Sequence, residues 1–140
     1  MSQINSGRVL LGGLVAGLVL NIGEFLLNGV LFGKEMGDIF RSFNVPPPGG
    51  SFFVAAILLT FALGVFIVWL YALIRARMGP GPKTAIIAAV VLWFSVYVYT
   101  GILNTLLFRT PLKLVVIGIV WGLAEYILAA LAGGWLYREA

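Results

Sequence analysis

Residues 13–28 of the chain read GLVAGLVLNIGEFLLN, an apolar run with small and polar residues at regular intervals. Steps of four, four, three and four residues separate Gly13, Gly17, Asn21, Glu24 and Asn28. At about 100° per residue, these steps place all five side chains on one narrow face of a helix. The run therefore predicts a membrane-spanning helix with one small and polar face, which we expect to point toward other helices.

The composition of the chain also indicates a membrane protein. Of 140 residues, 61% are hydrophobic and 10% are charged, and the mean hydropathy is +1.08, whereas soluble domains carry far more charge. The net charge of +4 comes from basic residues outside or at the edges of the apolar runs, so no nucleic-acid partner is expected. The chain has no His and no Cys, which removes the common metal, haem and nucleophile chemistry. We therefore expect no enzyme, no catalytic residues, no cofactor and no metal site.

Four apolar windows are each long enough to cross a bilayer as a helix of about 20 residues. They predict an all-α fold, a membrane-spanning four-helix bundle that forms a single transmembrane domain over residues 1–140. The predicted spans are Val9 to Phe32, Phe52 to Ile74, Ala85 to Phe108, and Leu112 to Tyr137. The first span is too long for the core of a signal peptide and carries Glu24, so we expect it to be retained.

The connection between the first two spans is the only long one. In Lys34 to Asn44, apolar residues alternate with charged ones at helical spacing, which predicts a short helix lying in the membrane interface. A surface helix packed on the end of the bundle is the open alternative. The run Pro46 to Gly50 (PPPGG) ends this helix and leads into the second span.

The connection at residues 75–83 reads RARMGPGPK, which is basic with no acidic residue nearby. By the positive-inside rule we place it in the cytoplasm. An even number of spans then puts both termini on the same side, where Arg8 and Arg138 bring the basic residues to five, against four on the opposite side.

Polar and small residues also follow the later spans. The third span offers Tyr97, Thr100 and Asn104, and the fourth repeats a small and acidic stripe with Gly118, Gly122 and Glu125. We expect Gly13, Gly17, Gly118 and Gly122 to pack helices closely, with the stripes facing one another. The candidate ligand-binding or proton-binding residues are Asn21, Glu24, Asn28, Tyr97, Thr100, Asn104 and Glu125.

The depth of these residues predicts a pocket. At 1.5 Å per residue, Asn21 and Tyr97 lie near the bilayer midplane, Glu24 and Thr100 roughly 6 Å outward, and Asn28 and Asn104 roughly 12 Å outward. Glu125 also lies near the midplane. We expect a polar pocket in the outer half of the bundle, with Glu125 at its floor and the Pro-rich connection above it.

The two glutamates decide what such a pocket can do. An ionised acid at the bilayer centre costs about 3 kcal/mol even on lenient scales, and no Lys or Arg lies at comparable depth. Protonation, a shared proton, a bound cation or water in the pocket would each lower the free-energy cost of placing these acids in the membrane. Interhelical hydrogen bonding alone is the open alternative. Trp121 falls in mid-span, where we expect it to face a partner, a pigment or lipid.

A weak inverted repeat relates the first and fourth spans. Residues Gly17 to Leu27 (GLVLNIGEFLL) align without gaps on Gly118 to Leu128 (GIVWGLAEYIL), with four identities. Because the two spans run in opposite directions, the relation would be inverted, as in transporters with midplane sites. Chance similarity between apolar helices is the alternative.

Several motifs resemble a family of small bacterial four-helix integral membrane proteins of unknown function. They are Ile4-Asn5, the glycine-rich first span with Asn21 and Glu24, Phe32-Gly33-Lys34, and Gly79-Pro80-Gly81-Pro82-Lys83. The resemblance covers about the first 85 residues, and the rest only by topology. It implies a multi-pass protein of the bacterial cytoplasmic (inner) membrane and no particular chemistry.

Three functions compete. The first is a small proton- or cation-linked carrier or channel that uses the pocket around Glu24 and Glu125, and for which we expect a homo-oligomer. The second is an accessory subunit of a larger respiratory or photosynthetic membrane complex, with no catalysis of its own. The third, an intramembrane enzyme using the two acids as a catalytic pair, has no supporting motif. Membrane lipids are expected partners in each case.

Overall fold

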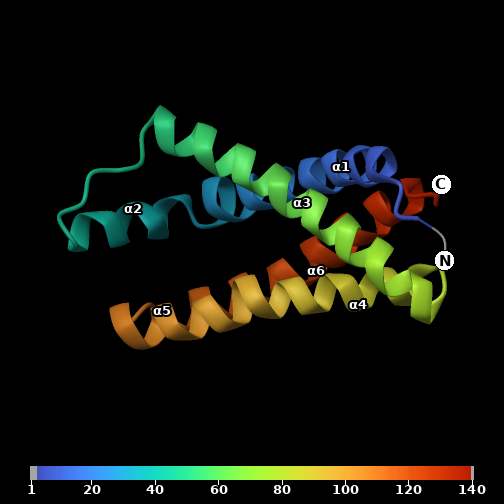
Figure 1. Cartoon of the computed structure of the whole chain (residues 1–140). Helices are drawn as coiled ribbons and strands as arrows, with labels where there is room; N and C mark the ends of the chain where they lie inside the picture. Colours follow the sequence, from blue (N-terminus) through green and yellow to red (C-terminus); the bar gives the residue numbers. More distant parts are fainter. Residues whose placement is uncertain (1–2, 140) are drawn as a thin grey trace.

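The structure, a computed structural model, describes residues 3–139 and is all-helical, with 85% helix and no strand in that range (Figure 1). Four helices are long and apolar enough to cross a membrane: Ser6–Leu31, Gly50–Met78, Pro82–Phe108 and Leu112–Leu136. Their ends lie within four residues of the predicted ones. In chain order the elements are α1 (Ser6–Glu24), η1 (Phe25–Leu31), α2 (Gly33–Ser42), α3 (Gly50–Met78), α4 (Pro82–Trp93), η2 (Phe94–Tyr99), α5 (Thr100–Phe108) and α6 (Leu112–Leu136).

The turn between α3 and α4 depends on two glycines. Gly79 and Gly81 adopt φ angles of +82° and +135°, which side chains larger than hydrogen rarely allow, and Pro82 then opens α4 with its fixed φ. The Thr84 hydroxyl donates to the carbonyl of Gly79 at 2.7 Å, and the Gly81 N–H donates to the Tyr71 hydroxyl at 3.2 Å. The predicted break at this motif is therefore a tight turn held by both flanking helices.

Glycines bring α1 and α3 into backbone contact. A Cβ atom at Gly13 would lie 2.5 Å from the Cα of Val65, and one at Gly17 would lie 2.8 Å from the Cα of Phe61. On the opposing helix, a Cβ at Gly64 would collide with the backbone of Gly13 and Gly17. Helices that lack these side chains can approach closely and gain van der Waals contact where lipid supplies no hydrophobic drive.

The contact between α1 and α6 uses different glycines from those predicted. A Cβ at Gly12 would lie 2.5 Å from the carbonyl oxygen of Gly133, and one at Gly133 would lie 2.6 Å from that of Gly12. The predicted packing glycines of α6, Gly118 and Gly122, are therefore not the ones that meet α1. Gly12 precedes Gly13 by one residue, which turns it about 100° around α1, so that α1 meets α3 on one face and α6 on the next.

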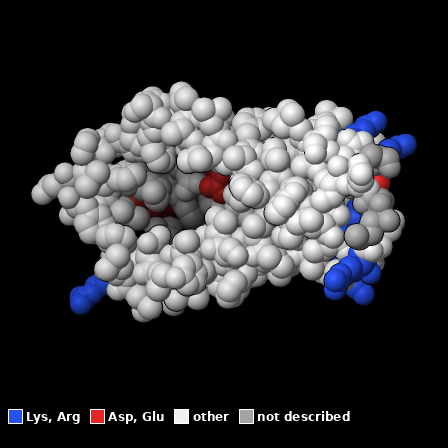
Figure 2. Space-filling view, in the orientation of Figure 1, with Lys and Arg blue, Asp and Glu red and all other residues white. Residues whose placement is uncertain are grey.

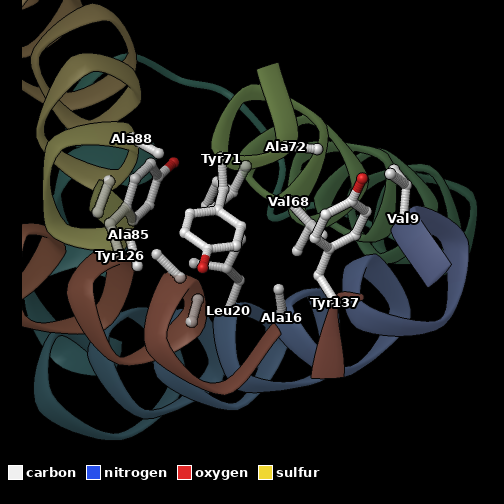
Figure 3. Close-up of a cluster of buried hydrophobic side chains, with 14 residues drawn as sticks. Val9, Ala16, Leu20, Val68, Tyr71, Ala72, Ala85, Ala88, Tyr126 and Tyr137 are labelled. Carbon is white, nitrogen blue, oxygen red and sulfur yellow. The ribbon is translucent and has the colours of Figure 1, made fainter. Parts of the chain in front are cut away.

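The buried core lies in the half of the bundle that carries both termini. Figure 3 shows small and aromatic side chains packed between α1, α3, α4 and α6, among them Ala16, Val68 and Ala88, which are fully buried. Tyr126 is the largest side chain in this core with almost no exposed surface. Alanine and glycine dominate because they let four helices share one narrow interior.

A polar clasp closes the terminal end of the bundle. Arg75 Nε forms an ion pair with Glu139 at 3.1 Å, and its guanidinium lies 5.7 Å and 5.2 Å from the ring centroids of Tyr71 and Tyr137. The backbone N–H of Asn5 donates to the Tyr137 hydroxyl at 3.3 Å. The two ends of the described chain and the end of α3 are thus joined through one arginine and two tyrosines.

The opposite half of the bundle is much less packed. Within the described chain, η2 and α5 contain no buried residue, α3 contains none before Gly64, and α6 contains none before Gly122. Leu106 and Leu107 on α5 leave about three quarters of their surface uncovered. The helices separate on this side, as Figure 1 shows for α3 above α5.

The connection between the first two spans contains the predicted helix, α2. Its apolar residues Met36, Ile39 and Phe40 are half-buried, whereas its charged residues are exposed, and Arg41 pairs with Asp38 on its surface. The amphipathic pattern is therefore present in the fold. At its end Phe43 packs edge-on against Phe108 of α5, with ring centroids 5.9 Å apart.

The α1–α3 contact makes a testable prediction. Gly64→Ala should lower the free energy of unfolding by about 1–3 kcal/mol, because the new methyl group forces two helix backbones apart. The thermal midpoint of the purified protein in detergent measures this effect. Gly118→Ala is the matched control, since a Cβ there would meet no atom within 4 Å. Equal midpoints for the two variants would contradict the contact.

Candidate functional site

Glu24 is held by side chains from two elements. It is the last residue of α1, where the chain passes into η1. The Tyr97 hydroxyl of η2 donates to Glu24 Oε1, and the Asn28 amide donates to Glu24 Oε2 at 2.9 Å. Both carboxyl oxygens therefore accept a hydrogen bond, and the carboxyl group is fixed between the first and third spans.

Glu125 lies beside Glu24 in a different environment. The residue is 5% exposed, and neither of its carboxyl oxygens has a hydrogen-bond partner. It packs on the backbone of α1, where a Cβ at Gly23 would lie only 2.7 Å from Glu125 Cδ. Glu24 follows Gly23 directly, and the Tyr97 ring that packs on Gly122, three residues before Glu125, carries the hydroxyl that donates to Glu24, so both acids belong to the α1–α6 contact.

Aromatic side chains surround the two acids. The Tyr97 ring covers Gly122, where a Cβ would lie 2.7 Å from ring carbons, and meets the Tyr126 ring edge-on at 5.5 Å. The Trp121 indole donates to the carbonyl oxygen of Gly23 at 3.1 Å. The indole N–H therefore bonds within the chain, whereas the half-buried ring lines an open apolar groove on α6, so that the expectation that Trp121 faces a partner, a pigment or lipid stays a prediction.

The first and third long helices, which carry Glu24 and Tyr97, both widen into π-helical turns at these residues. η1 begins directly after Glu24 and includes Asn28, and η2 includes Tyr97. The N–H of Phe32 bonds to the carbonyl of Leu27, five residues back, at 2.8 Å. An extra residue in a turn displaces everything beyond it by about 100° around the helix, and such turns are frequent at functional sites.

Two predicted residues, Thr100 and Asn104, form no hydrogen bond with either acid in the described chain. Thr100 is exposed and donates its hydroxyl to the carbonyl of Val96 in its own helix, and Asn104 is also exposed. Gly101 faces α6 instead, where a Cβ would lie 3.9 Å from Ile119. An unbroken α-helix would have aligned Thr100 and Asn104 with Tyr97.

Two more of the predicted residues lie apart from the carboxyl pair. The Asn21 amide donates to the carbonyl of Gly17 at 2.9 Å and to that of Ile57 on α3 at 3.4 Å, so it joins two helices. Gly118, predicted as a packing residue, faces open space, whereas Gly122 packs under Tyr97. The structure thus brings Glu24, Asn28, Tyr97 and Glu125 together and leaves Asn21, Thr100 and Asn104 outside.

A hollow opens beside the site. Figure 2 shows it between the separated helices of the less packed half, with acidic side chains visible inside. At its outer end, a cavity of about 350 Å³ lies between α2 and the α5–α6 turn, lined by Asp38, Phe43, Phe108, Arg109 and other residues. The hollow is therefore bounded at that end by side chains of α2 and α5.

Among the residues that the structure describes, no basic side chain forms an ion pair with either acid. Among residues 3–139 the ion pairs are Arg41–Asp38 and Arg75–Glu139, and both lie near the ends of the helices. In the same range no three His, Cys, Asp or Glu residues are grouped as metal ligands. Two carboxyl groups in a medium of low polarity repel each other unless a proton or a cation lies between them.

Comparisons with known protein families, curated proteins and solved structures find no match to this chain. The family resemblance suggested by the sequence motifs therefore has no support from these comparisons. The function has to be inferred from the geometry of the candidate site.

Sequence reasoning missed Gly23 and Tyr126. Gly23 lies one position off the polar stripe, but its neighbour Glu24 and the α6 acid together required a backbone without a side chain at their contact. Tyr126 follows Glu125 and was hidden among other aromatic residues of an apolar helix. Gly23 could have been predicted from the sequence, because a small residue directly precedes the acid Glu24 within an apolar helix.

The unequal bonding of the two acids predicts opposite stability effects. Glu125→Met should raise the free energy of unfolding by about 1–3 kcal/mol, because it removes a buried group without a partner. Glu24→Met should lower it, because the Tyr97 hydroxyl and the Asn28 amide lose their acceptor. Thermal midpoints in one detergent measure both. A loss of stability of the same size in both variants would contradict this account of Glu125.

Proposed function

We propose that the chain is a small membrane carrier in which Glu24 and Glu125 together bind a proton or a cation. The observation behind this proposal is the Glu125 carboxyl group, which is buried, has no hydrogen-bond partner and lies beside a second acid. A purely structural acid would gain by finding a donor or by being an apolar residue. An unfilled carboxyl pair is the arrangement that a transported cation or proton completes.

The surrounding groups suggest a division of roles. Tyr97 and Asn28 position Glu24 by donating to it, whereas Glu125 has both oxygens free to take up the proton or cation. The other titratable groups that face the pair are the phenols of Tyr97 and Tyr126. One proton shared between the carboxyl groups would remove their repulsion, and its release would leave a binding site for a positive charge.

The uneven packing favours a carrier over an open channel. The hollow opens in one half of the bundle, with acidic side chains visible inside it in Figure 2, and the tightly packed half around Ala16, Val68 and Ala88 closes the other side. A bound ion can leave toward the termini only if these helices move apart. Alternating access of this kind is the usual mode of carriers with midplane sites. The exposed faces of α5 and α3 would be covered by a second copy or by lipid.

An accessory subunit of a larger membrane complex is the second candidate. Its support is the extent of uncovered apolar surface, which includes Trp135 at 82% exposure and Leu106 at 75%. Such faces suit contact with lipid and with other membrane subunits alike. In this case the carboxyl pair would serve the partner rather than a transported ion.

We place the protein in the bacterial inner membrane with both termini in the cytoplasm and α2 in the opposite interface. The charge distribution supports this orientation, since Arg8, Arg75, Arg77, Lys83 and Arg138 belong to the terminal end. Figure 2 shows basic side chains gathered at that end. The half-buried apolar face of α2 supports its position at the membrane surface.

Because the chain has no cysteine, its orientation is open to a direct test. In intact cells, a membrane-impermeant maleimide should label Ser42→Cys, which lies at the end of α2. Met78→Cys, at the end of α3, should be labelled only after the membrane is opened. The reverse pattern would show that the termini lie outside.

Proton movement tests the carrier. Purified protein in liposomes with an internal pH dye should admit protons under an imposed membrane potential, and Glu24→Gln and Glu125→Gln should each reduce the rate at least about tenfold, as expected for a loss of more than 1.4 kcal/mol. Glu139→Gln, at the terminal end, is the matched control and should leave the rate unchanged. Unchanged flux in both site variants would remove the carrier. No flux from the wild type, with a stoichiometric partner on native purification, would favour the accessory subunit.

A further inference from the structure

We infer that the cavity between α2 and the α5–α6 turn binds the headgroup of one phosphatidylethanolamine-type lipid, in which a phosphate is joined to a primary ammonium group. This inference does not rest on the carrier, because neither acid of the carboxyl pair lines this cavity. It depends on three observations: the place of the cavity at the ends of the long helices, the opposite charges on its walls, and the apolar surface beside it.

The cavity lies at the level where three of the long helices end or begin. The first long helix ends at Leu31, shortly before α2, the third ends at Phe108 and the fourth begins at Leu112. Figure 1 shows α2 and α5 at the same end of the bundle. Since the long helices would stand across the bilayer, their ends lie at the depth of the lipid headgroups. The cavity volume of about 350 Å³ is within the range of small-molecule sites.

Two opposite charges line the cavity from different elements. Glu35 belongs to α2, and Arg109 follows the end of α5. Among residues 3–139 neither of them forms an ion pair, whereas Asp38, the other charged residue of the lining, is paired with Arg41. A ligand that completes this site therefore carries one positive and one negative group. A purely anionic headgroup would leave Glu35 without a counter-charge.

The two charged groups of phosphatidylethanolamine match these walls. A guanidinium such as that of Arg109 can donate in parallel to two phosphate oxygens, and the Glu35 carboxylate can accept from the N–H groups of the ammonium. The Ser42 hydroxyl, which also lines the cavity, donates to the carbonyl of Ile39 and can still accept one more N–H. A choline headgroup has no N–H to donate, so it would fit these acceptors less well.

The apolar side chains beside the cavity suit the rest of a lipid. Phe43 and Phe108 belong to the lining and pack edge-on against each other. On the adjoining ends of the third and fourth long helices, Leu106, Leu107 and Leu112 each leave at least 70% of their surface uncovered. Acyl chains that leave a headgroup in the cavity would run along these leucines. A soluble fragment of the headgroup would lack this contact.

Arg109 occupies a position that glycine would fit better. It ends α5 with a φ angle of +52°, the left-handed conformation in which helices usually place glycine. The strain that a larger residue brings there is offset when its guanidinium binds a phosphate. Arg109→Gly should therefore remove the charge without lowering the thermal midpoint of the protein.

The lipid preference of the wild type is the first test, and it does not depend on how a variant folds. Native mass spectrometry of the delipidated protein in detergent, titrated with lipids of identical acyl chains, gives a dissociation constant for the first bound lipid. Phosphatidylethanolamine should bind at least tenfold more tightly than phosphatidylglycerol, which has no ammonium group, and than phosphatidylcholine. Equal binding of phosphatidylethanolamine and either of the other lipids would overturn the inference.

Substitutions then locate the bound lipid. Glu35→Gln and Arg109→Gly should each weaken the binding of phosphatidylethanolamine at least about tenfold, as expected for the loss of a hydrogen bond between charged groups. Lys113→Gln is the matched control, because it removes a basic residue near the same turn that does not line the cavity. This variant should bind as the wild type does. Undiminished binding by either site variant would overturn the inference.

A soluble competitor separates a lipid from a free zwitterion of the same chemistry. Glycerophosphoethanolamine carries the same headgroup without acyl chains, and a tenfold molar excess of it should not displace phosphatidylethanolamine. Displacement at equal concentration would show that the occupant is a soluble molecule and would overturn the lipid site. Because lipid binding is measured without a proton gradient and at residues outside the carboxyl pair, its failure would leave the carrier standing.

Discussion

The site depends on the close approach of α1 to its two neighbours. Where Gly12 meets Gly133, the two backbones of α1 and α6 lie in contact, and about three helical turns farther along α1 the same contact continues at Gly23. The Glu125 side chain occupies the space that a side chain at Gly23 would fill. Helix packing and the position of the acid are therefore one feature, because the glycines that let α1 and α6 approach closely also bring Glu125 next to Glu24.

The two acids illustrate how neighbours set the chemistry of a residue type. Glu24 has donors for both oxygens, whereas Glu125 has none and is the more deeply buried. In a soluble protein, water could enter and satisfy the second carboxyl group. Among the apolar and aromatic side chains around Glu125, the missing partner must be a bound cation or a proton. The pair is thus asymmetric, with one fixed member and one receptive member.

The sequence predicted the four long helices well because apolar length alone determines them. It also placed Glu24, Asn28 and Tyr97 in one polar pocket, but at three different depths, whereas Tyr97 and Asn28 both donate to the Glu24 carboxyl group in the structure. It could not predict η1 and η2, because no proline or glycine pattern announces a π-helical turn and the tertiary contacts decide where one forms. Neither Thr100 nor Asn104 forms a hydrogen bond with the acids in the described chain, and Thr100 donates to Val96 of its own helix instead. Which of Gly12 and Gly13 contacts α6 likewise depends on how α3 and α6 are arranged around α1, and the sequence does not show this arrangement.

The π-helical turns η1 and η2 lie in the first and third long helices, directly after α1 and α4. These two helices run in the same direction, and the Tyr97–Glu24 hydrogen bond joins them. Beyond this level the chain has few packing partners, and before it the helices are held by glycine contacts and by the clasp at Arg75. The two outer segments therefore leave the bundle from the level of the Glu24 carboxyl group, where Tyr97 joins them, and lack the direct backbone contacts that hold the inner half.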